Sequence, residues 1–129
     1  MSLTVEQLVA AARSRIREIA PQELAAWQDR DHVLIDVREP GEYAQGHISG
    51  AVNLPRGVLE FQIQAHPAMA CNTSDSLAQP SRRLVLYCLS GGRAALAADS
   101  LQKLGFTAVC SLAGGFNGWC AAGLPVATE

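Results

Sequence analysis

The order of segments along the chain predicts an α/β fold, a three-layer α/β/α sandwich whose central sheet is mainly parallel. Runs such as Val33–Val37 and Arg83–Cys88 are apolar at most positions, which is typical of parallel strands buried on both faces. Segments with helical spacing of apolar residues alternate with these runs, as the crossovers between parallel strands require. The 129 residues suffice for one domain that buries its own core.

The N-terminal segment, residues 1–16, carries a helix signal. Thr4 and Gln7 make a capping box, and apolar residues follow at helical spacing, so we expect an amphipathic helix over residues 5–16. Residues 17–129 are then expected to form a single domain, in which Pro21 opens a short second helix.

Apolar runs identify the remaining strands, helical spacing identifies the helices, and Gly or Pro marks their ends. Strands are expected at Val33–Val37, Ala51–Leu54, Arg83–Cys88 and Ala108–Leu112, and helical segments at Glu42–Gln45, Val58–Ala65, Arg93–Leu104 and Phe116–Ala122. Pro55 ends the second strand, and Gly105 stands where the C-cap of the long helix belongs. Residues 66–82 show no period, so 58–82 is expected to be a longer insert that ends in a loop.

Composition excludes several classes of function. Ten basic and twelve acidic side chains give a formal net charge of −2, so the chain lacks the broad basic surface of a nucleic-acid binder. Its apolar runs are far shorter than the ~20 residues that span a bilayer, and Glu6 argues against a secretory signal at the N-terminus. We therefore expect a cytoplasmic protein with no nucleic-acid or membrane partner.

The four cysteines are expected to be free thiols. Cys71, Cys88, Cys110 and Cys120 show no zinc-binding spacing, and the three histidines form no paired-ligand pattern, so no metal is expected. A disulfide framework is not needed in a chain that is large enough to stabilise itself. Cys110 falls inside a predicted strand and is expected to be buried and inert, whereas Cys71 lies in the polar loop.

Cys88 stands where a predicted strand becomes a helix, which is the position of a candidate nucleophile. The strand delivers it to the carboxyl edge of the sheet, where open parallel sheets bind ligands. The loop Leu89-Ser90-Gly91-Gly92 lets backbone amides turn inward, and the following helix and Arg93 add positive charge. Such surroundings favour an anion, so Cys88 is predicted to be largely thiolate at neutral pH and Leu89–Arg93 to cradle an anionic substrate.

Three stretches together resemble the rhodanese-like family of sulfurtransferases and cover most of residues 17–126. Cys88, Gly91 and Arg93 match the family's signature Cys-x-x-Gly-x-Arg. Residues 34–55, LIDVREPGEYAQGHISGAVNLP, match its second hallmark, and residues 105–119 resemble its last strand and closing helix.

The resemblance implies a rhodanese-like fold and a sulfur transfer in two steps. Cys88 would take the outer sulfur of a small anionic donor, such as thiosulfate or a low-molecular-weight persulfide. The resulting cysteine persulfide would pass this sulfur to cyanide, a thiol or an acceptor protein. The transient persulfide replaces any bound cofactor, and none is expected.

Several residues outside the loop have expected supporting roles. Asp36 ends a central strand and Arg38 follows it. Asp36 is expected to brace the site by accepting hydrogen bonds or by pairing with an arginine, with direct catalysis as the alternative. His47 is expected to hydrogen-bond locally and fix a turn rather than act as a base. Cys71 is expected to be an ordinary thiol, with a resolving role toward the Cys88 persulfide as the alternative, and Arg56 is a weaker candidate for the crevice.

Two other functions stay open. One is a non-enzymatic rhodanese-like module that regulates, carries sulfur or binds a partner. The other is a cysteine phosphatase or arsenate reductase, which the four residues between Cys88 and Arg93 disfavour, because those enzymes resemble this loop but place five there. Leu89 departs from the basic or polar residue frequent in the family, which is expected to weaken thiosulfate binding or to favour a bulkier and less charged donor, such as a glutathione persulfide or a protein. Ala94 replaces a frequent hydroxyl residue and removes one hydrogen bond.

Overall fold

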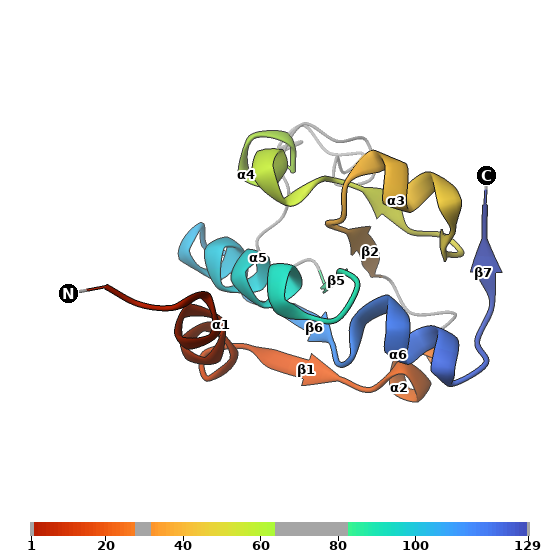
Figure 1. The fold of residues 1–129 in the computed structure, drawn as a ribbon, viewed down its shortest axis with the longest axis horizontal. Helices are drawn as coiled ribbons and strands as arrows, with labels where there is room; N and C mark the ends of the chain where they lie inside the picture. Colours follow the sequence, from red (N-terminus) through yellow and green to blue (C-terminus); the bar gives the residue numbers. More distant parts are fainter. Residues whose placement is uncertain (1, 28–31, 64–82, 129) are drawn as a thin grey trace.

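A five-stranded parallel sheet forms the centre of the protein (Figure 1). The computed structural model describes residues 2–27, 32–63 and 83–128. In spatial order the strands are β1 (Arg17–Ile19), β6 (Val109–Leu112), β5 (Leu84–Tyr87), β2 (Val33–Asp36) and β4 (Val52–Asn53). Helices flank this sheet, which confirms the predicted α/β fold class.

Residues on β5, the middle strand, alternate between two hydrophobic clusters, one on each face of the sheet. Leu84 and Leu86 join the first cluster, with side chains of α4 (Leu59–Gln62) and α5 (Gly92–Lys103). Val85 and Tyr87 join the second, with side chains of α2 (Pro21–Ala25) and α6 (Gly115–Ala121). All four β5 residues are buried, which explains why the strand reads as one continuous apolar run.

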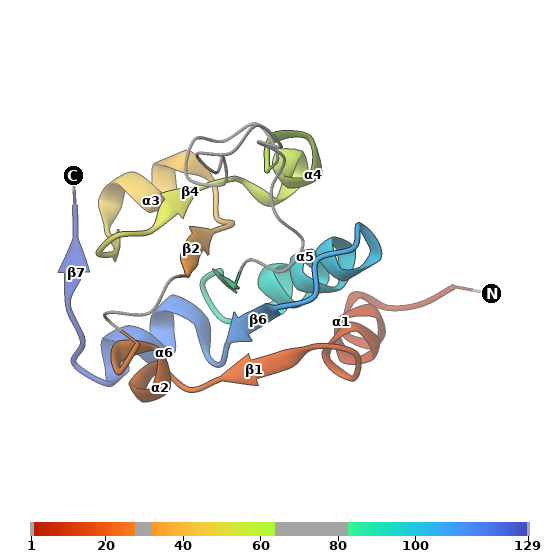
Figure 2. The ribbon, with the colours of Figure 1, turned by 180° about the vertical axis from the view of Figure 1, so that it is seen from behind.

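The N-terminal helix α1 (Val5–Arg13) packs beside α5 (Figures 1 and 2). The capping box of Thr4 and Gln7 is present, as predicted. The helix nevertheless ends at Arg13 instead of residue 16, because residues 17–19 turn into strand β1 and pair with β6. This three-residue edge strand exposes two of its side chains, so it has too short an apolar pattern to be identified from the sequence.

The other differences from the predicted elements are small. An antiparallel pair, β3 (His47–Ile48) with β7 (Val126–Ala127), was not expected. The segment expected as a helix at residues 58–65 is preceded by a 3-10 turn, η1 (Arg56–Val58), and continues as α4. Helix α3 (Pro40–Gln45) begins earlier than expected, because Pro40 suits a first helical turn. The loop at 66–82 lies outside the described residues. None of the helices in the described ranges is long and apolar enough to cross a membrane.

Candidate active site

Cys88 follows β5 at the carboxyl edge of the sheet, and its sulfur accepts hydrogen bonds from the backbone. The Gly91 amide lies 3.0 Å from Cys88 Sγ, and the Ala94 amide lies 3.4 Å from it. Gly91 adopts φ +122°, a conformation that side chains rarely allow, and it precedes the first turn of α5. Cys88 is 1% exposed, so these amides replace water around its sulfur. Ala94 lies one residue beyond the loop expected from the sequence, because the first helical turn also points its amides at the sulfur.

Residues 88–92 form the cysteine loop. Two backbone hydrogen bonds from the start of α6 hold this loop, and we call these contacts the α6 clamp. The amide of Phe116 donates to the carbonyl of Cys88 at 2.7 Å, and the amide of Asn117 donates to the carbonyl of Leu89 at 3.0 Å. A Cβ on Gly115 would lie 2.5 Å from the Cys88 carbonyl oxygen, so glycine alone permits this approach. Gly115 lies in the stretch 105–119 that resembles the family's last strand and closing helix, but the sequence predicted no contact between it and the cysteine loop. The two hydrogen bonds join residues 28 positions apart, so they have no local signal in the sequence.

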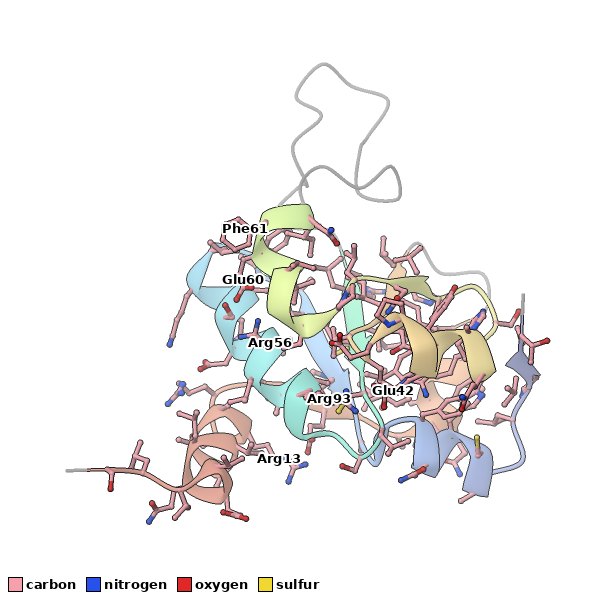
Figure 3. The ribbon with its side chains drawn as sticks, turned by 45° about the horizontal axis from the view of Figure 1, so that its top comes forward. Arg13, Glu42, Arg56, Glu60, Phe61 and Arg93 are labelled. Carbon is pink, nitrogen blue, oxygen red and sulfur yellow. The ribbon has the colours of Figure 1, made fainter. Side chains whose placement is uncertain are left out.

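Arg93 is directed toward α3. Its guanidinium donates to both carboxylate oxygens of Glu42, with distances of 2.9 and 3.2 Å (Figure 3). These hydrogen bonds, with that from the Glu39 amide, lower the pKa of Glu42 from 4.5 to about 2. Glu42 in turn raises the pKa of Arg93. The sequence predicted that Arg93 would serve the anion cradle, whereas in the structure its charge is balanced by a carboxylate.

Asp36 and Arg38 form a buried ion pair at the end of β2. Arg38 Nη2 lies 2.6 Å from Asp36 Oδ2 and 2.7 Å from the Gly46 carbonyl oxygen, and the Arg38 backbone amide also donates to Asp36. The guanidinium carbon lies 4.4 Å from the centre of the Phe116 ring. The pair therefore connects β2, α3 and α6, and these contacts support the bracing role expected for Asp36.

His47 is buried and engaged in local contacts. Its Nδ1 lies 2.8 Å from the Tyr43 carbonyl oxygen, and its ring stacks on the Tyr43 ring with a centroid distance of 3.7 Å. Both contacts join α3 to β3, and they support the expected role in fixing the turn. Arg56, a weaker candidate for the crevice, pairs with Glu60 at 3.0 Å within its own helical segment.

A hollow of about 340 Å³ lies beside the cysteine loop. Leu89 contributes an apolar side chain to its wall, and Phe116, Asn117 and Cys120 contribute from α6, while the remaining lining residues are Arg38, Glu42, Gln45 and Gly46. A molecule that approaches the loop from this side meets both apolar and charged groups.

The other cysteines differ in their surroundings. Burial raises the pKa of the Cys110 thiol from 9.0 to about 11, which agrees with an inert side chain. Cys120 is exposed, and Cys71 lies outside the described residues. Within the described ranges, no three His, Cys, Asp or Glu side chains gather in a group suited to a metal ion.

These features define an α/β protein with a hydrogen-bonded cysteine in a loop at the carboxyl edge of a parallel sheet. Residues 20–122 match the Rhodanese-like domain family, and the chain belongs to that family. The resemblance found in the sequence is thereby confirmed.

Relatives of the chain include named sulfurtransferases. Thiosulfate sulfurtransferase 16, chloroplastic, of Arabidopsis thaliana is 37% identical over 97 residues, which cover 73% of this chain and 78% of that protein. The “Probable adenylyltransferase/sulfurtransferase MoeZ” of Mycobacterium tuberculosis is 35% identical over 114 residues, which cover 85% of this chain and 26% of that longer protein. Among solved structures, the protein of unknown function RPA3614, “Possible Tyrosine Phosphatase”, from Rhodopseudomonas palustris superposes with a TM-score of 0.79 at 30% identity, covering 98% of this chain and 96% of that one.

Proposed function

We propose that this protein is a sulfurtransferase that carries sulfane sulfur as a persulfide on Cys88. The observation that carries this proposal is the pair of backbone amides, from Gly91 and Ala94, that donate to Cys88 Sγ. Amide donors stabilise negative charge on sulfur, and they need no rearrangement during the reaction because the fold already holds them in place. The proposed reaction uses no bound cofactor.

The first step forms the persulfide. The Cys88 thiolate attacks the outer sulfur of thiosulfate, so that a new S–S bond forms while the S–S bond of thiosulfate breaks and sulfite leaves with the electron pair. In the second step, cyanide attacks the outer sulfur and releases it as thiocyanate. Cys88 Sγ is then the leaving atom, and the same two amides stabilise the charge that returns to it.

Burial of Cys88 restricts the donor. Because residue 88 is almost fully covered, a slender donor with a terminal sulfur atom, such as thiosulfate or a small persulfide, suits this site better than a bulky donor. The α6 clamp, which binds the carbonyls of Cys88 and Leu89, keeps the cysteine loop in the conformation that directs backbone amides at Cys88 Sγ. A thiol or an acceptor protein can take the place of cyanide in the second step.

Two observations favour sulfur transfer over phosphate chemistry, the function that the name of RPA3614 suggests. Four residues separate Cys88 from Arg93, which makes a smaller cradle than a tetrahedral phosphate needs. Arg93 also donates to Glu42, whereas a phosphatase uses the arginine of this loop to hold the phosphate. The relative from Arabidopsis, which is named a thiosulfate sulfurtransferase, supports the same choice.

Intact-mass spectrometry tests the proposal. After incubation with thiosulfate, the wild-type protein is expected to gain the mass of one sulfur atom and to lose it again with cyanide. Cys88→Ser is expected to gain none, while Cys120→Ser, which removes an exposed thiol, is expected to behave as the wild type. The proposal fails if the wild type takes up no sulfur from thiosulfate or from glutathione persulfide. Cys88-dependent hydrolysis of p-nitrophenyl phosphate would favour the phosphatase instead.

A further inference from the structure

Helix α1 lies before the residues that match the rhodanese-like family, yet it packs directly on the cysteine loop. The family match begins at residue 20, and α1 ends at Arg13. Arg13 Nη2 lies 2.9 Å from the position that a Cβ on Gly91 would occupy, and Val9 Cγ2 lies 3.8 Å from the equivalent position on Gly92. Arg13 and Val9 are one helical turn apart, so a single face of α1 covers both loop glycines.

The position of Arg13 is set by contacts elsewhere on the N-terminal segment. Arg15 donates to both carboxylate oxygens of Asp99 on α5, at 2.9 and 2.8 Å, and Gln102 donates to the Arg15 carbonyl at 2.9 Å. Ala12, in the last turn of α1, is fully buried. These contacts anchor the end of α1 to α5, and Figure 3 shows Arg13 pointing from α1 toward the loop that precedes α5.

Arg13 lies close enough to act on Cys88. Gly91 joins the two groups, because its amide is 3.0 Å from Cys88 Sγ and its Cβ position is 2.9 Å from Arg13 Nη2. Since N and Cβ of one residue are about 2.5 Å apart, Nη2 lies within roughly 8.5 Å of Sγ. That separation is comparable to the Debye length of about 8 Å at physiological ionic strength, so the charge of Arg13 is felt at the sulfur.

The charge of Arg13 is balanced more weakly than the charges of the other arginines near the site. Arg93 is paired with Glu42 at 2.9 Å and Arg38 with Asp36 at 2.6 Å. Arg13 has a longer contact, 3.6 Å between its Nε and Glu18, and its side chain is 44% exposed. Its fork of N–H donors is suited to the oxygens of an anion.

We infer that Arg13 positions the sulfur donor, by binding the anionic end of a small molecule such as thiosulfate while the sulfane sulfur reaches Cys88. This inference rests on the proposed function. Leu89 is apolar and Arg93 is paired with Glu42, so in this proposal the cation that binds the donor comes from α1, a helix outside the family match.

Alkylation of Cys88 by iodoacetate and by iodoacetamide tests the inference without sulfur transfer. The two reagents differ in charge, and peptide mass spectrometry reports the modification of Cys88 alone. Arg13→Gln is expected to lower the ratio of the iodoacetate rate to the iodoacetamide rate by about three- to tenfold at low ionic strength, and by less in high salt. Arg17→Gln is the matched control, because it removes an exposed arginine that is paired with Glu23, and it is expected to keep the wild-type ratio.

Two further measurements separate charge from structure. Arg13→Lys keeps the charge and is expected to restore most of the ratio. In the sulfur-transfer assay, Arg13→Gln is expected to raise KM for thiosulfate with little change in kcat. The inference is overturned if Arg13→Gln and Arg17→Gln give the same ratio. It is also overturned if Arg13→Lys lowers the iodoacetate-to-iodoacetamide ratio as much as Arg13→Gln does, since helix packing would then be responsible. A lowered ratio in a protein that takes up no sulfur would sink the proposed function and leave the anion site.

Discussion

The guanidinium of Arg93 and the carboxylate of Glu42 meet in a two-pronged ion pair, although the residues lie 51 positions apart in the sequence. The pair joins the first turn of α5 to the first turn of α3. Glu42 also accepts a hydrogen bond from the Glu39 amide, so a single carboxylate caps α3 and holds the start of the helix that follows Cys88. Through this pair, Arg93 fixes the start of α5 and with it the end of the cysteine loop.

The Arg93–Glu42 pair predicts a pH dependence of stability. The pKa of Glu42 is lowered to about 2 in the folded protein, so its carboxylate stabilises the fold above its ordinary pKa of 4.5, and this contribution is lost as the pH falls toward 2. Glu42→Gln is expected to lower the free energy of unfolding by up to about 1 kcal/mol at pH 7, because both side chains are partly exposed. Urea unfolding between pH 7 and pH 2.5 measures the difference from wild type, which shrinks below pH 4.5. A constant difference over that range would show that the ion pair is not the cause.

The clamp between α6 and the cysteine loop predicts that Gly115→Ala is severely damaging. A Cβ there meets backbone oxygen at 2.5 Å, and φ is +58°. We expect a loss of at least about 2 kcal/mol in the free energy of unfolding and little sulfur uptake by Cys88. Gly123→Ala is the matched control, since φ is +74° there and nothing lies within 4 Å. It is expected to cost only about 1 kcal/mol and to keep sulfur uptake. Equal losses in the two variants would argue against the clamp.

Replacement of Ser111 by alanine is predicted to keep or raise the stability of the fold. The Ser111 hydroxyl is buried in β6 without a hydrogen-bond partner among the described residues. Ser111→Ala removes this group, so the free energy of unfolding is expected to stay level or to rise by up to about 1 kcal/mol. Ser100→Ala, which removes a hydroxyl that donates to Glu60, is expected to lower it. Thermal unfolding compares the two variants, and a marked loss for Ser111→Ala would reveal an unrecorded partner.

The two thiols Cys110 and Cys120 are predicted to react very differently. The pKa of Cys110 is raised to about 11 by burial, so at pH 8.5 its thiol stays protonated and therefore unreactive. Iodoacetamide is expected to modify exposed Cys120 in the folded protein and to modify Cys110 only in urea. Peptide mapping by mass spectrometry makes the comparison, and rapid labelling of folded Cys110 would contradict the buried placement.

Much of the fold was predictable because its signals are local. The run Leu84–Tyr87 is apolar at each position since both of its faces are covered, and the capping box at Thr4 marks a helix start within four residues. The place of Cys88 between a strand and a helix was predictable for the same reason. Strand β1 escaped prediction because three residues at a sheet edge carry too little pattern, and its pairing with β6 depends on residues over 90 positions away.

By itself, the sequence determined the order of the main strands and helices, the cysteine at a strand end and the family, because each depends on neighbours along the chain. Only the tertiary structure decided where distant charged side chains lie: Arg93 meets Glu42, and Arg13 lies against the loop at Gly91. A charged side chain is neutralised by the opposite charge that lies nearest in space, and that partner is known only once distant segments have packed together.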